Sequence, residues 1–223
     1  MYDLMEGVRV IEVAEHTFVP AAGVVLADWG ADVIKVERSV GGGDPARSLR
    51  ILQRPGQKLN AYFEVANRGK RSVALDLTRP EGRQALYKLI EGADVFTTNL
   101  RADARRKLGI EPEDLMKHNP RLIYARGTGY GVRGAMADHG GFDYPSSWCR
   151  SGSGFVQTPA DGSRPPQQPG QVATLRSEEH TSELQSRHTR CSRDWSSDVC
   201  SSDLIASTLR SARWCSRATP SAP

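Results

Sequence analysis

Residues 7–38 read GVRVIEVAEHTFVPAAGVVLADWGADVIKVER, and this stretch decides the fold that we expect. Residues 8–13 are rich in β-branched side chains with an alternating pattern, which predicts a strand. Pro20 suits the first turn of a helix, and Gly30 suits its end. Residues 32–37 repeat the strand pattern. A strand, a short helix and a second strand predict a βαβ unit, so the two strands should be parallel.

The alternation of strand and helix patterns continues along the chain. The remaining strands are predicted at residues 72–77, 94–98 and 121–125, and the remaining helices at residues 78–91 and 112–118. Residues 41–57 are rich in Gly, Pro and Arg and predict a loop. This order predicts an α/β fold with an open, mainly parallel sheet and helices on both faces. In such sheets ligands bind beyond the carboxyl ends of the strands.

The composition excludes several classes of protein. The chain has 223 residues, of which 38% are hydrophobic, and no run approaches the length of about 18 apolar residues that a membrane span needs. Residues 1–6 contain neither the basic nor the apolar region of a secretory signal. The net charge of +4 is mild and evenly spread, which does not indicate nucleic-acid binding. We therefore expect a cytoplasmic protein with no nucleic-acid or membrane partner.

The chain changes character after Leu175. Residues 1–175 hold all 21 glycines of the sequence. Average usage would place about three glycines in a stretch as long as residues 176–223, which has none. Residues 176–204 also lack a helical or strand period. We therefore expect a tail that is disordered or foreign to the native protein.

The codons that can encode this tail indicate its origin. Residues 176–181, together with the first two bases of the Ser182 codon, and residues 198–204 can be encoded by reverse-complementary strings that resemble a sequencing adapter. We predict three parts: the N-terminal part of a large domain at residues 1–175, an adapter-like segment at 176–204, and a frame-shifted or non-native tail at 205–223.

Two patterns look like cofactor sites and do not predict one. Residues 129–134 match G-x-G-x-x-G, but they follow the fifth predicted strand, and the glycines after them break any helix that a dinucleotide site would need. The second pattern has a spacing that lacks the paired short intervals of zinc modules. It consists of His180, His188, Cys191 and Cys200. We expect a loop at the first pattern and no metal site at the second.

Positive residues flank several of the predicted strands. Arg38 follows the second strand, Lys70 and Arg71 precede the third, and residues 101–107 follow the fourth. Such groups suit a ligand that bears phosphate. Solvated surface charge is the alternative, and the residue pattern alone leaves both interpretations open.

A series of short motifs covers nearly all of residues 1–170. The motifs are GVRVIE (7–12), LADWGADVIKVER (26–38), NRGKRS (67–72), LDL (75–77), ADV (93–95), Asn99, NPRLIYA (119–125), GFDY (141–144) and RSG (150–152). Their order resembles that of the class III CoA-transferases of the CaiB/BaiF type, a family that includes formyl-CoA transferase and α-methylacyl-CoA racemase. The resemblance implies a Rossmann-like large domain, an interlocked homodimer, and CoA thioesters as substrates rather than a tightly bound cofactor.

The resemblance also implies which residues contact CoA. His16 and Thr17 match the active-site entrance, where some members of the family have glutamine. Lys107 matches a position where some members have arginine, and its ammonium group would pair with phosphate as a point charge. The residues that match the lining of the CoA site are Arg38, Leu75, Asp76, Asn99 and Leu100.

The chemistry implied by the resemblance depends on an aspartate that attacks the acyl-CoA thioester and forms a mixed anhydride. The released thiolate attacks that anhydride, and the acceptor acid then enters the aspartyl-CoA thioester by the same steps in reverse. This aspartate is implied shortly after residues 165–170, where the chain has Ala173, Thr174 and Leu175 instead. Asp161 lies upstream in a predicted turn and does not replace it. The catalytic residue is therefore unknown, and we expect the chain as written to be an inactive fragment of a CoA-transferase.

Two alternatives remain beside transfer of CoA between an acyl-CoA and a carboxylic acid. The first is an acyl-CoA racemase or epimerase of the same family, which needs an acid/base pair at the α-carbon. Racemase-like members tend to have a histidine near the position of Phe142, so this residue favours transfer. The second is a non-catalytic module that binds CoA.

Overall fold

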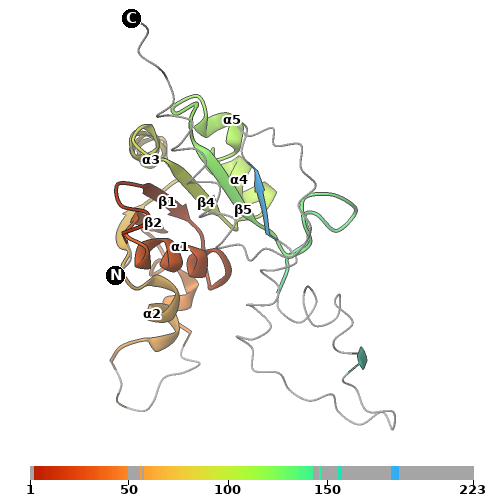
Figure 1. Cartoon of the computed structure of the whole chain (residues 1–223). Coiled ribbons are helices and arrows are strands. Elements are labelled where there is room, and N and C mark those ends of the chain that lie inside the picture. Colours follow the sequence, from red (N-terminus) through yellow and green to blue (C-terminus); the bar gives the residue numbers. More distant parts are fainter. Residues whose placement is uncertain are drawn as a thin grey trace, which may run out of the picture.

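The computed structural model describes residues 3–49, 56, 58–142, 146, 155–156 and 182–185, and these form a single twisted sheet with helices around it (Figure 1). The strand order is β3-β2-β1-β4-β5-β6. Strands β1 to β5 are parallel to their neighbours, and β6 is antiparallel to β5. The predicted α/β class with a mainly parallel sheet is confirmed. The strands are β1 (Arg9–Val13), β2 (Asp32–Arg38), β3 (Arg71–Leu75), β4 (Val95–Thr98), β5 (Ile123–Gly127) and β6 (Ser182–Gln185).

The predicted βαβ unit is β1, helix α1 (Phe18–Asp28) and β2, with Val10 opposite Val33 in the parallel ladder. Gly30 ends the helix as expected. Its φ of 96° lies in the region that favours glycine, and its N–H donates to the carbonyl oxygen of Ala27 at 3.0 Å. The chain thus enters β2 immediately after α1.

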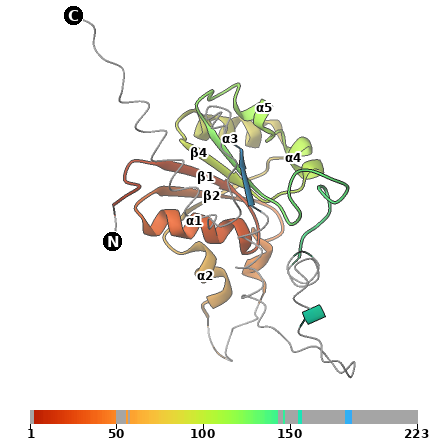
Figure 2. The same cartoon turned by 45° about the vertical axis from the view of Figure 1, so that its right-hand side comes forward.

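Alternate residues of the buried strands pack into two cores, one on each face of the sheet. Val10 and Val33 pack with Leu26 of α1 on one face. On the other face Ile11 and Phe96 pack against helices α3 (Pro80–Glu91) and α5 (Pro112–Leu115). Figure 2 shows α1 and α3 on opposite sides of the sheet. Both faces are therefore covered, as the sequence predicted.

Three helical elements were not predicted from the sequence. They are the 3-10 helix η1 (Pro45–Arg47), helix α2 (Ala61–Asn67) and helix α4 (Ala102–Leu108). All are short, so none repeats an apolar period long enough to be recognised. Helix α2 depends instead on a cap, because the side chain of Asn60 accepts a hydrogen bond from the N–H of Phe63 at 3.2 Å.

Strand β6 corrects one expectation, since Ser182–Gln185 lies in a segment for which no regular element was predicted. A strand at the edge of a sheet pairs through its backbone groups, so pairing with β5 needs no side-chain period. By contrast, residues 129–134 form neither helix nor strand, which confirms the predicted loop.

Several predictions lie outside the described residues. They concern the missing aspartate at residues 173–175, the His and Cys pattern at residues 180–200, and the domain boundaries at 175 and 204. Among the described residues, no group of three or more His, Cys, Asp or Glu side chains is arranged to hold a metal ion. No helix in this part of the chain is both long and apolar enough to cross a membrane.

Candidate functional site

The carboxyl edge of the sheet carries a crevice because the chain changes direction there. Strand β1 pairs with β2 on one side and with β4 on the other. The connections that leave β1 and β4 therefore run to opposite faces of the sheet, and the space between them is where open α/β sheets bind ligands. Residues 14–17 follow β1, and residues 99–101 follow β4.

A cavity of about 1330 Å³ lies at this edge. We call it the carboxyl-edge cavity, and its size is sufficient for a ligand larger than a typical metabolite. Its walls come from the turn after β1, the segment after β4 with helix α4, and the loop after β5. Five residues predicted from the sequence line it: His16, Thr17, Asn99, Leu100 and Lys107.

The other three predicted residues lie at the same edge and outside this lining. Arg38 and Leu75 are opposite each other at the ends of β2 and β3. Arg38 is linked to the cavity indirectly, because its Nε lies 3.1 Å from the Oε1 of Glu15, which lines the cavity. Asp76 follows β3, and its carboxylate accepts hydrogen bonds from the N–H and hydroxyl of Thr78. These bonds hold the pKa of Asp76 below its usual value, and they order the turn that leads into α3.

The cations around the cavity fall into two groups. Arg105 is buried and structural, because it pairs with Glu111 at 3.2 Å and donates to the carbonyl oxygen of Leu100 at 2.6 Å. Within the described part of the chain, no ion pair engages Arg101, Lys107 or Arg126, and all three line the cavity. The Nε of Arg126 is buried and makes no hydrogen bond. The buried Nε of Arg126 favours an anionic ligand, whereas Arg101 and Lys107 are exposed and are solvated in the absence of one.

The turn after β1 is held from several sides. Asn99 holds Glu15 at both backbone groups: its Oδ1 accepts from the N–H at 3.0 Å, and its Nδ2 donates to the carbonyl oxygen at 2.7 Å. The hydroxyl groups of Thr17 and Tyr62 share a hydrogen bond of 2.6 Å. Asn99 was predicted from the sequence, whereas Tyr62 was missed because it lies on α2, which was not predicted.

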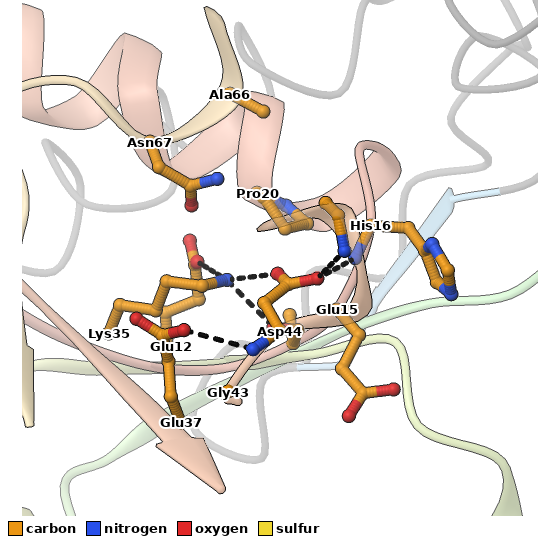
Figure 3. A network of polar contacts seen from close by, with 12 residues as sticks. Glu12, Glu15, His16, Pro20, Lys35, Glu37, Gly43, Asp44, Ala66 and Asn67 are labelled. Atoms are coloured by element: carbon orange, nitrogen blue, oxygen red, sulfur yellow. Dashed lines mark hydrogen bonds and ion pairs between the residues drawn. The ribbon is translucent and has the colours of Figure 1, made fainter. Parts of the chain in front are cut away.

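Four charged side chains are buried behind this turn, and we call them the buried charge network. They are Glu12, Lys35, Asp44 and Lys70, each with a side chain at most 2% exposed. The Nζ of Lys35 lies 3.1 Å from Glu12 and 2.9 Å from Asp44, and the Nζ of Lys70 lies 2.9 Å from Glu12. Figure 3 shows Lys35 between Glu12 and Asp44. Two cations and two anions balance, which makes their burial tolerable.

Sequence reasoning missed the buried charge network although a signal was present. Glu12 and Lys35 each interrupt an otherwise apolar strand, at residues 10–13 and 33–36. Parallel strands covered on both faces are usually continuous apolar runs, so a charge inside one requires a partner. The register places Glu12 directly opposite Lys35.

The pKa values of the two lysines in the network are shifted in opposite directions. Burial lowers the pKa of Lys70 to about 8, although the nearby Glu12 carboxylate raises it. Burial also lowers the pKa of Lys35, but the carboxylates of Glu12 and Asp44 outweigh it, so the net pKa is raised. Lys35 is therefore the cation that the two carboxylates hold most firmly in its charged form.

Glu37 anchors the loop that carries Asp44, and its lowered pKa makes the stability of the protein depend on pH. Burial raises the pKa of Glu37, but the Arg47 guanidinium, the N–H of Asp44 and the hydroxyl of Ser72 outweigh it and lower the pKa from 4.5 to about 2. A carboxyl group whose pKa is lowered by folding stabilises the protein above its unfolded pKa, and this contribution is lost as the pH falls toward the folded pKa.

We therefore expect the free energy of unfolding to fall by up to about 3 kcal/mol between about pH 5 and about pH 2 through Glu37 alone. Urea unfolding followed by circular dichroism at a series of pH values measures this loss. The E37Q variant has no carboxyl group to titrate, so its stability should change less over the same range. Equal pH dependence of the two proteins would contradict the assignment.

Comparison with known proteins identifies relatives of most of the chain. The model of the family described as CoA-transferase family III matches residues 5–174. Succinate–glutarate CoA-transferase from Agrobacterium fabrum is 44% identical over 144 residues, which cover 63% of this chain and 36% of that protein. (R)-2-hydroxy-4-methylpentanoate CoA-transferase from Clostridioides difficile is 36% identical over 149 residues, or 67% of this chain and 37% of that protein. The chain thus spans about a third of the length of these curated relatives.

Solved structures with the same fold are also similar. The hypothetical protein Rv3272 from Mycobacterium tuberculosis superposes with a TM-score of 0.67 at 36% identity, covering 78% of this chain and 45% of that one. A CAIB/BAIF family protein from Brucella suis has a TM-score of 0.63 at 28% identity, covering 100% of this chain and 59% of that one.

Proposed function

The chain belongs to CoA-transferase family III, whose model matches residues 5–174, and on this premise we propose that its parent enzyme moves CoA between an acyl-CoA and a carboxylic acid. The observation that carries the proposal is the position of five family-implied residues along one cavity at the carboxyl edge of the sheet. Three cations without an ion pair in the described part of the chain line the same cavity, which supports a ligand with several negative charges. A CoA thioester fits that requirement.

We assign the family's roles to this chain residue by residue, as proposals. His16 and Thr17 stand at the entrance, Asn99 and Leu100 line the CoA site, and Lys107 pairs with phosphate. Arg38, Leu75 and Asp76 complete the site along the neighbouring strand ends. The Nε of Arg38 lies 3.1 Å from the Oε1 of Glu15, which lines the cavity, and this contact supports its assignment.

The catalytic aspartate is not among these assignments. The resemblance implies it at residues 173–175, where the chain has Ala-Thr-Leu. We propose that residues 1–175 are the N-terminal part of the family's Rossmann-like large domain and that residues 176–204 and 205–223 are not native. The strand order β3-β2-β1-β4-β5 supports this description of the domain. A cytoplasmic, interlocked homodimer is proposed for the intact parent from the family resemblance.

Binding of CoA by the 223-residue chain tests the proposal. We expect isothermal titration calorimetry to show binding of CoA and weaker binding of pantetheine, which lacks the nucleotide and its phosphates. The K107A variant should bind CoA about fivefold more weakly, because one charge-assisted contact to phosphate is lost. Pantetheine binding should not change in this variant.

K117A is the matched control, because Lys117 is an exposed lysine paired with Asp114 and does not line the cavity. It should bind CoA as the unsubstituted chain does. No measurable binding of CoA by the unsubstituted chain would exclude the proposed site, and equal losses in K107A and K117A would exclude the role of Lys107.

A further inference from the structure

His16 has an unusual backbone conformation at the mouth of the carboxyl-edge cavity. Its φ is 66°, and among the described residues it is the one non-glycine with a positive φ. A Cβ atom makes this left-handed conformation unfavourable, so contacts with the surrounding structure must hold it. Residues in such conformations cluster where a site needs a side chain in one fixed direction.

Asp44 provides the contact that holds it. The Oδ1 of Asp44 accepts a hydrogen bond from the N–H of His16 at 3.0 Å and a second from the N–H of Ala46 at 2.9 Å. Asp44 is 3% exposed, and its own N–H donates to the Oε2 of Glu37 at 3.0 Å. Figure 3 shows the His16 ring directed away from Asp44, so the carboxylate contacts the peptide and leaves the imidazole to the cavity.

Lys35 connects this contact to the buried charge network. Its Nζ lies 2.9 Å from the Oδ2 of Asp44 and donates to the carbonyl oxygen of Ala14 at 2.8 Å. One ammonium group therefore holds the turn at Ala14 directly and at His16 through Asp44. The two contacts lie on either side of Glu15, whose backbone groups are held by Asn99. The turn is fixed from β2, from the loop after β2 and from the segment after β4.

We propose that Asp44 is a positioning residue that holds His16 in the left-handed conformation and thereby fixes the direction in which the imidazole enters the carboxyl-edge cavity. The identity of the ligand, an acyl-CoA, rests on the proposed function. The positioning of His16 rests on the hydrogen bonds alone. Asp44 does not itself line the cavity, and it acts through the peptide N–H of His16, which does.

The D44N substitution separates this role from simple packing. The carboxylate accepts from His16 and Ala46 with one oxygen and faces the Lys35 ammonium with the other. An asparagine side chain has nearly the same shape but one NH2 group, which must face either the ammonium or the two N–H donors. One of these contacts becomes donor against donor, so the His16 peptide loses its acceptor or Lys35 loses its partner.

The experiment uses the 223-residue chain with ¹⁵N-labelled histidine. In D44N we expect the His16 amide resonance to move and its hydrogen exchange to become faster, since in either orientation of the asparagine the amide donates to a neutral oxygen or to no acceptor, in place of a buried carboxylate. CoA should bind about tenfold more weakly by calorimetry, a change of ~1.4 kcal/mol. The control is D94N, because the Oδ2 of Asp94 accepts from the N–H of Arg9 at 2.8 Å at the opposite edge of the sheet. D94N should leave the His16 amide and CoA binding unchanged.

Substitution of His16 by glycine tests whether Asp44 acts on His16 or stabilises the protein in another way. The H16G variant adopts a positive φ without strain, so residue 16 no longer depends on Asp44 for its conformation. We expect D44N to destabilise the unsubstituted chain more than it destabilises H16G, measured as a coupling in a double-mutant cycle of urea unfolding. An additive cycle would mean that Asp44 stabilises the protein without acting on His16.

The readouts separate the two proposals. An unmoved His16 amide in D44N, or an additive cycle, overturns the positioning role whether or not CoA binds. Absence of CoA binding by the unsubstituted chain overturns the proposed function, and the amide and the cycle still decide the role of Asp44. If D44N does not fold, D44E takes its place, because glutamate keeps the charge but moves the carboxylate by one methylene group. A folded D44E protein with a shifted His16 amide resonance supports the positioning role. A folded D44E protein with an unshifted resonance contradicts it.

Discussion

The K35M substitution is expected to lower the free energy of unfolding by about 3–5 kcal/mol. Lys35 is 1% exposed, and methionine fills nearly the same volume without the charge. The carboxylates of Glu12 and Asp44 would then remain buried with Lys70 as the single cation of the buried charge network. An uncompensated buried charge is costly, because the surrounding apolar residues cannot replace its lost hydration. Urea unfolding at neutral pH measures the effect.

K88M is the control for this substitution. Lys88 lies in the last turn of α3 and is exposed, so removal of its charge should change stability by less than about 0.5 kcal/mol. Equal effects of K35M and K88M would show that the network does not contribute to stability.

The G23A substitution is expected to destabilise the protein by about 2–3 kcal/mol, although alanine favours helices by about 1 kcal/mol over glycine. Gly23 lies inside α1, where the helix passes over the buried charge network. A Cβ at this position would lie 2.0 Å from the Oε2 of Glu12 and 3.0 Å from the Cε of Lys70. The methyl group would displace the carboxylate from its lysines, so packing reverses the sign that helix propensity predicts.

A double-mutant cycle isolates the cause. In the E12A background the carboxylate is absent, so G23A should be neutral or stabilising by up to about 1 kcal/mol. The E12A protein is itself less stable, because its two buried lysines lose their shared partner. Were G23A equally harmful in both backgrounds, the close approach to Glu12 would not be the reason for glycine.

The network places costly charges next to the candidate site rather than elsewhere in the core. A well-packed apolar group of the same volume often replaces a buried ion pair without loss of stability. The ammonium of Lys35, however, also holds Ala14 and, through Asp44, His16. An apolar side chain cannot accept or donate these bonds. The arrangement is therefore consistent with charges that serve the geometry of the cavity more than the stability of the sheet.

Much of the fold could be predicted because its signals are local. Gly30 marks the end of α1, and the apolar runs of β1 and β2 on either side require a parallel pair. The five residues that line the cavity were reached through motif order, since each follows the carboxyl end of a strand or lies on the helix after it. The short helix α2 was missed, because its cap at Asn60 is a local bond with no apolar period behind it.

The parts that were missed depend on contacts between residues far apart in the chain. Asp44 lies in a stretch that the sequence presents as a Gly- and Pro-rich loop, where its local contact is the N–H of Ala46. Its distant partners are His16, in the turn after β1, and Lys35, on β2. Lys70 meets Glu12 across a separation of 58 residues. No periodic pattern records such pairs.

The amino-acid sequence by itself determined the parallel α/β sheet, the membership of residues 5–174 in CoA-transferase family III, and the strand ends at which the candidate site residues lie. It did so because side-chain period and motif order are properties of neighbouring residues. The tertiary structure decided which charges are buried together and how the turn at His16 is held. That outcome depends on the folded chain excluding water from Lys35 and Asp44, so that each can be satisfied only by partners within the fold.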